Sequence, residues 1–126
     1  MYKNLTITSL LGFIAIILGA FGAHALKSKL SIDEMNSFNT AVRYQMYHVI
    51  VLLFVNMFTG FSKIQKNKLS YLFFIGILFF SGSIYLIQLT SITAKPIWFI
   101  TPLGGLFFIF GWLLMTLLFY KNNKKN

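Results

Sequence analysis

Four long apolar segments, separated by three shorter polar connections, run along this chain. Each segment has about 20 residues, the length that an α-helix needs to cross a bilayer core of about 30 Å. The pattern predicts an all-α integral membrane protein with four transmembrane helices, forming a single domain over residues 1–126. The expected spans are residues 5–25, 41–61, 69–89 and 97–120.

The second helix is expected to begin before its apolar part. Ser31-Ile32-Asp33-Glu34 matches a capping box, in which the Ser31 hydroxyl accepts from the Glu34 amide and the Glu34 carboxylate accepts from the Ser31 amide. A helix from Ile32 to Thr59 would be about 42 Å long at about 1.5 Å per residue, which exceeds the bilayer core. Residues 32–40 are therefore expected to form an amphipathic extension at or above the interface.

Small residues recur on one face of the other three segments, where they would let a neighbouring helix approach closely. The predicted packing seam consists of Gly12, Ala15, Gly19, Gly22, Gly76, Ser83, Gly104, Gly105 and Gly111. A seam inside the monomer is the expected use, and a seam between copies of the chain is the alternative.

Polar residues within the spans are expected to face the bundle, because polar groups in lipid need partners. The predicted buried polar cluster consists of Gln45, His48, Ser81, Tyr85 and Gln88. His48 is expected to hydrogen-bond Ser81 or Tyr85. His24, at the end of the first span, is expected to cap that helix or to meet lipid head groups.

Composition supports the membrane class, because 57% of the residues are hydrophobic and only 10% are charged. The net charge of +9 comes from lysines beside the apolar segments. That placement favours contact with anionic lipids and excludes a basic nucleic-acid-binding domain. The N-terminus, second connection and tail carry one, three and three Lys or Arg residues, whereas the first and third connections carry three and one. This excess predicts cytoplasmic N- and C-termini in the cell membrane, with multiple crossings.

Few residues offer chemistry. The chain has no cysteine, which excludes disulfides and thiolate sites. His24 and His48 are weak candidates for a haem or metal pair, and no cofactor or metal is expected because acidic second-shell partners are missing. Both acids, Asp33 and Glu34, lie outside the spans, which argues against an ion-coupled carrier. Ser81 and Ser83 lack a nucleophile-elbow motif, so no enzyme activity is expected.

A cleaved signal peptide is an alternative for the first segment, because Lys3 precedes the apolar run and Ala23-His24-Ala25 resembles a cleavage site. The apolar run is longer than the about 7–15 residues usual in signal peptides. Retention of this span is therefore expected.

Four ordered motifs carry a family resemblance: Gly19-Ala20-Phe21-Gly22-Ala23-His24-Ala25-Leu26, Thr40-Ala41-Val42-Arg43-Tyr44-Gln45 with His48, Phe80-Ser81-Gly82-Ser83-Ile84-Tyr85, and Thr101-Pro102-Leu103-Gly104-Gly105 with Gly111-Trp112. They touch all four segments. The chain resembles the domain of unknown function 423 family, small four-span membrane proteins related to eukaryotic transmembrane protein 256. The resemblance implies four helices and an uncleaved first span, and it supplies no catalytic residues.

The functional expectation is a non-enzymatic membrane protein that acts by helix packing, by self-association or by holding lipid or another membrane protein, with a role in membrane integrity. The alternative is a small-molecule or haem binder that uses an outer-side pocket around His48, Gln45, Tyr85 and Gln88.

Overall fold

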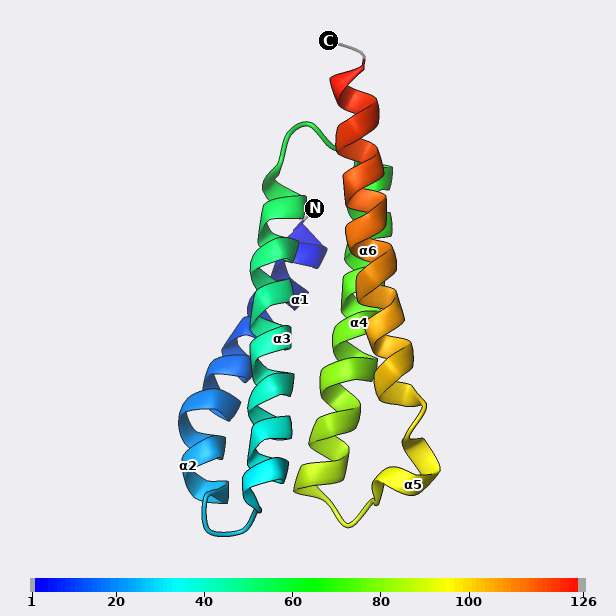
Figure 1. The fold of residues 1–126 in the computed structure, drawn as a ribbon. Helices are drawn as coiled ribbons and strands as arrows, with labels where there is room; N and C mark the ends of the chain where they lie inside the picture. Colours follow the sequence, from blue (N-terminus) through cyan, green and yellow to red (C-terminus); the bar gives the residue numbers. More distant parts are fainter. Residues whose placement is uncertain (1, 125–126) are drawn as a thin grey trace.

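The computed structural model describes residues 2–124, and every regular element in that range is a helix. The elements are α1 (Tyr2–Ile17), η1 (Leu18–Gly22), α2 (Ala23–Leu26), α3 (Ile32–Met57), α4 (Lys63–Leu89), α5 (Ala94–Ile97) and α6 (Ile100–Asn123). The long helices run side by side (Figure 1). The N-terminus, the connection 58–62 and the C-terminus share one end, here called the terminal end. The connections 27–31 and 90–99 share the other, the loop end.

The first apolar segment is one continuous helical path from Tyr2 to Leu26, with a π-helical turn at Leu18–Gly22 that the apolar pattern did not predict. Within this turn the Ala23 amide donates to the Leu18 carbonyl, five residues back. The π-turn contains two glycines of the expected seam, Gly19 and Gly22.

α3 begins where the capping box placed it. The Glu34 amide donates to the Ser31 hydroxyl over 3.2 Å, and the Ser31 amide donates to the Glu34 carboxylate over 2.8 Å. The helix ends at Met57, before the expected Thr59, because Phe58 has an extended backbone. Thr59, expected on the inner face, is exposed in the connection.

α4 begins at Lys63, six residues before the predicted span, because Ser62 and Gln65 form a second capping box. This box was not predicted from the sequence. The Gln65 amide donates to the Ser62 hydroxyl over 3.3 Å, and the Ser62 amide donates to the Gln65 side chain over 2.8 Å. Lys63, Lys66 and Lys68 therefore lie on the first turns of a helix and not in a loop. Most of the predicted fourth span, residues 100–120, lies in α6; Ile97 ends α5, and Trp98 and Phe99 separate the two helices.

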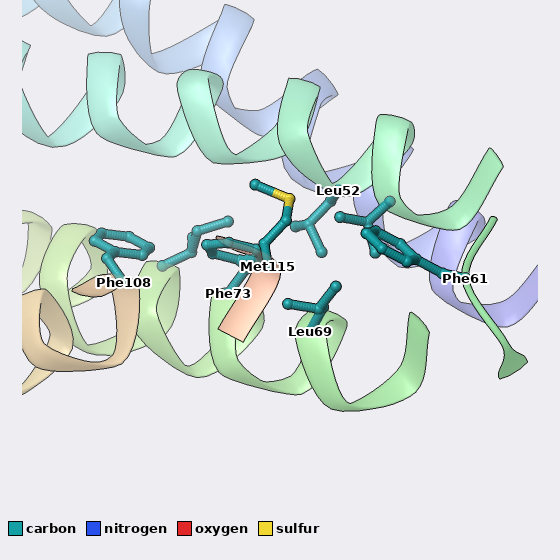
Figure 2. Packing of buried hydrophobic residues seen from close by; sticks show 8 residues of the cluster. Leu52, Phe61, Leu69, Phe73, Phe108 and Met115 are labelled. Atoms are coloured by element: carbon teal, nitrogen blue, oxygen red, sulfur yellow. The ribbon is translucent and has the colours of Figure 1, made fainter. Parts of the chain in front are cut away.

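The core lies between α3, α4 and α6. A cluster of buried side chains fills this space along the helices (Figure 2): Leu52, Val55, Phe61, Leu69, Phe73, Ile77, Phe108 and Met115. α4 packs against both α3 and α6, and α1 packs mainly against α3. The outer surface carries many large apolar side chains, among them Phe13, Leu78 and Ile109, each more than half exposed. Such a surface suits lipid and not water.

Three helical stretches among the described residues are long and apolar enough to cross a membrane: Tyr2–Leu26, Lys63–Leu89 and Lys95–Asn123. α3, which contains the predicted second span, is not among them. Its 26 residues include both acids and several amides. Among its polar side chains, Gln45, His48 and Asn56 are buried within the bundle.

Candidate functional site: polar groups inside the helix bundle

Two glycines hold two aromatic rings where α4 meets α6. A Cβ added to Gly76 of α4 would come within 2.5 Å of the Phe108 ring, and one added to Gly111 of α6 would come within 2.6 Å of the Phe73 ring. The phenylalanine of each helix therefore packs directly over the glycine of the other, and these two glycines are called the Gly76 and Gly111 seats. Both rings reach His48 of α3.

His48 of α3 packs on these rings. Its imidazole is nearly parallel to the Phe108 ring, with centroids 3.7 Å apart and an interplanar angle of 3°, and the Phe73 centroid is 5.5 Å away. His48 Nδ1 lies 2.6 Å from the Tyr44 carbonyl, and the Trp112 indole N–H donates to His48 Nε2 over 3.2 Å. The prediction that His48 bonds Ser81 or Tyr85 is wrong. Its hydrogen bonds go to a carbonyl of its own helix and to a side chain of α6.

These bonds determine the protonation of His48. A carbonyl only accepts and an indole N–H only donates, so Nδ1 carries the proton and Nε2 is the acceptor of a neutral ring. Both nitrogens are thus engaged. A haem iron or metal ion at His48 would have to displace the Trp112 indole from Nε2, and the loss of that hydrogen bond would weaken its binding.

Of the other members of the predicted polar cluster, only Gln45 and Tyr85 bond each other. Gln45 donates to the Leu11 carbonyl of α1 over 2.8 Å and accepts from the Tyr85 hydroxyl over 2.7 Å, so it links α1, α3 and α4. Ser81 donates to the Ala41 carbonyl over 2.7 Å. Gln88 is half-buried. Since Ser81 and His48 bond different groups, they do not form a serine–histidine dyad.

The α4–α6 seam continues toward the loop end. Ser83 and Thr101 share a hydrogen bond between their hydroxyls. One turn along α6, a Cβ on Gly104 would lie 2.2 Å from the Phe80 backbone nitrogen, so the helix backbones touch there. Gly105 differs: its nearest neighbour would be the Phe80 side chain at 4.0 Å. Gly104 is thus at the contact, and Gly105 lies at its edge.

Along α1 and η1 the small residues face α3. A Cβ on Gly12, Gly19 or Gly22 would meet Val49, Val42 or Phe38 respectively, at 3.1–3.3 Å. Ala15 is buried. The small-residue face of the first segment therefore lies against α3 within the monomer.

A second polar network, at the terminal end, was missed by the sequence reasoning. The Asn4 amide of α1 donates to the side-chain oxygens of Asn56 and Asn67 over 3.1 and 3.0 Å. Asn56 donates to Ser70 over 2.9 Å, and Lys66 Nζ donates to the Asn56 carbonyl over 3.0 Å. The available signal was Asn4, which lies four residues before Thr8 on the small-residue face of the first helix.

His24 lies in α2 with its side chain exposed, whereas His48 bonds residues of α3 and α6. The two histidines of the proposed pair therefore sit in different environments. Within residues 2–124, no three His, Asp or Glu side chains gather where they could hold a metal ion. All buried side-chain nitrogen and oxygen atoms in this range have hydrogen-bond partners.

The sequence model of a family described as "Protein of unknown function (DUF423)" matches residues 18–105, more than half of the chain. The chain belongs to this family. The match begins at the π-turn of the first helix and ends at the Gly104–Gly105 contact, so it includes His48, Gln45 and the Gly76 seat. Trp112, the partner of His48, lies beyond the matched range.

Relatives in Staphylococcus and Haemophilus align with most of the chain. The UPF0382 membrane protein of Staphylococcus haemolyticus is 45% identical over 82% of this chain and 83% of its own. That of Staphylococcus saprophyticus is 44% identical over 82% and 85%. That of Haemophilus influenzae is 38% identical over 88% of both. These names state membrane association and give no activity. No solved structure matches the chain.

Proposed function

We propose that this protein is a non-enzymatic, four-crossing protein of the cell membrane that acts by packing within the bilayer and contributes to membrane integrity. One observation carries the proposal: every buried side-chain nitrogen and oxygen atom of the described residues has a hydrogen-bond partner within the protein. Gln45, Ser81 and Asn56 each bond a group on another helix. Such bonds stabilise a helix assembly in lipid and leave no reactive constellation.

α3 is proposed as the fourth crossing. It is as long as the other spans, about 39 Å at about 1.5 Å per residue, and it runs between α1 and α4 (Figure 1). Its low hydropathy comes from side chains such as Gln45, His48 and Asn56, which are buried against other helices. A helix that faces protein on several sides needs less apolar surface than one that faces lipid.

Both termini are proposed to lie in the cytoplasm. Lys3, Lys63, Lys66, Lys68, Lys121 and Lys124 gather at the terminal end, whereas both acids lie at the loop end. Positive residues are retained on the cytoplasmic side of bacterial membrane proteins. The proposed partners are anionic lipids at this end, with a second copy of the chain or another membrane protein against the apolar outer surface.

Cysteine labelling tests the crossings, because the chain contains no cysteine of its own. We expect Asn36→Cys and Ser91→Cys, exposed at the loop end, to react with an impermeant thiol reagent applied to intact cells. Thr59→Cys, exposed at the terminal end, should react only after permeabilisation. A three-span protein in which α3 stays on one side would label Asn36→Cys and Thr59→Cys alike, and that result would reject the fourth crossing.

A deletion strain tests the role. We expect greater entry of a membrane-impermeant dye than in the parent, with rescue by the wild-type gene and by Gly105→Ala. Gly104→Leu, which would force α4 and α6 apart, should not rescue. Unchanged permeability in the deletion strain, together with a purified monomer that retains no lipid or protein partner, would reject the proposal.

A further inference from the structure

A hollow opens at the terminal end beside the asparagine network. It has a volume of about 260 Å³ and is lined by Asn56, Phe61, Lys63, Lys66 and Asn67. Phe61 and Asn56 are buried, Lys66 and Asn67 are half-buried, and Lys63 is exposed. The hollow therefore has a fixed floor and a charged rim that faces out of the bundle.

The side-chain groups that remain free for a ligand around this hollow are donors. Lys66 Nζ is held by the Asn56 carbonyl, and that single bond leaves protons of its ammonium for a ligand. The Asn67 oxygen accepts from Asn4, so the group that Asn67 offers is its amino group. Asn56 uses its own oxygen for Asn4 and its amino group for Leu52 and Ser70. With Lys63 at the rim, the site suits an anion and repels a cation.

Two neighbouring features favour a lipid as the source of that anion. Met57 and Ile64, next in sequence to Asn56 and Lys63, are 68% and 69% exposed, so apolar surface adjoins the charged rim. The terminal end also carries lysines without acids among the described residues, which draws anionic lipid toward it.

We propose that this hollow binds the phosphate group of an anionic phospholipid in the leaflet at the terminal end, through Lys63, Lys66 and Asn67. The proposal deepens the proposed function and rests on it for the choice of leaflet. Lys66 is the central group, because its bond to the end of α3 sets its ammonium in place before the lipid arrives.

The test uses the full-length protein in detergent and measures retained lipid by native mass spectrometry. Phosphatidylglycerol should be retained over phosphatidylcholine. Lys63→Gln/Lys66→Gln should weaken phosphatidylglycerol retention by roughly tenfold or more, given about 1 kcal/mol per lysine near an anionic head group. Lys121→Gln/Lys124→Gln removes the same charge at the same end, outside the hollow, and should retain lipid within about twofold of wild type. Equal losses in the two variants would show diffuse attraction and overturn the site.

A folding defect in the double variant is controlled by two further variants. Lys63→Gln alone, at an exposed position, should weaken retention several-fold, and Lys63→Arg/Lys66→Arg should retain lipid because it keeps both charges. Full retention by Lys63→Gln and loss by the arginine variant would overturn the proposal.

A separate arm identifies the source of the phosphate. Inorganic phosphate should displace phosphatidylglycerol from the wild type in a concentration-dependent way. If inorganic phosphate raises the Tm of the wild type but not of Lys63→Gln/Lys66→Gln, and phosphatidylglycerol is not retained, the ligand is soluble phosphate and the lipid assignment is overturned. Cysteine labelling is independent: intact topology with no lipid retention would remove this inference and leave the four-crossing proposal standing.

Discussion

His48 is held by groups on two helices and by a stack of rings. Its nitrogens bond the Tyr44 carbonyl and the Trp112 indole, and its face covers Phe108. Phe108 in turn lies over Gly76. His48, a candidate ligand by its sequence, has both ring nitrogens hydrogen-bonded inside the bundle and packs between two helices.

We expect His48→Phe and His48→Ala to differ in stability. Phenylalanine keeps the ring over Phe108 and loses the hydrogen bonds to the Tyr44 carbonyl and the Trp112 indole, at a cost of about 1–2 kcal/mol. Alanine leaves a cavity among the four aromatic side chains that surround His48, at a cost of about 3 kcal/mol. Unfolding of the purified variants in a detergent titration measures both. An equal loss for the two variants would mean that the hydrogen bonds, not the packing, govern this position.

At the scale of the element, α4 is the helix on which the bundle depends, because it contacts α3 through Ser70 and Ser81 and approaches α6 backbone to backbone at Gly104. Small residues allow this approach, and without a hydrophobic driving force in lipid, close packing and hydrogen bonds drive association. The capping box at Ser62 begins α4 before the apolar segment.

Gly104→Ala and Gly105→Ala form a matched pair on α6. A methyl group at position 104 would overlap the backbone of α4 at Phe80, whereas at 105 it would only touch the Phe80 ring. We expect Gly104→Ala to destabilise by about 1–3 kcal/mol through overpacking. Gly105→Ala should be neutral or stabilising by up to about 1 kcal/mol, because alanine favours helix. Thermal unfolding in detergent distinguishes them, and comparable destabilisation would contradict the backbone contact.

Asn56→Leu is expected to loosen α1 from α3 and α4. It would leave the buried Asn4 amide and the Ser70 hydroxyl each short of one partner, at a cost of about 1–3 kcal/mol per unsatisfied group. The control is Asn36→Leu, the same substitution at an exposed position of α3, which should change stability by no more than about 0.5 kcal/mol. Urea or detergent unfolding measures both, and similar values for the two would argue against a stabilising network.

At the scale of the whole molecule, the described helices differ in how much of their surface is buried. α3, α4 and α6 enclose the buried cluster, and α1 lies against α3 (Figures 1 and 2). The positive charge of the terminal end and the acids of the loop end give the assembly a polarity along its length. Stability should follow the differences in burial, since regions with few buried contacts open most readily.

Hydrogen exchange should therefore rank the segments. In detergent or nanodiscs, we expect amides at the centre of α4, around Phe73 and Ile77, to exchange most slowly. The π-turn with α2 (Leu18–Leu26) and the short α5 should exchange fastest among the described helices. Mass spectrometry of deuterated peptides reports this order. Faster exchange at the centre of α4 than at Leu18–Leu26 would contradict the assignment of the core.

The membrane class, the helical elements and the start of α3 at its capping box were predictable from the sequence, because hydropathy, helix capping and small-residue spacing act locally along the chain. The hydrogen-bond and packing partners of the buried residues were not predictable, because they depend on which helices pack against one another. The sequence favoured Ser81 or Tyr85 for His48, whereas the Gly76 and Gly111 seats bring Phe108 and Trp112 of α6 to its ring. The hollow at Lys66 likewise exists only because Asn56 at the end of α3 meets the first turn of α4.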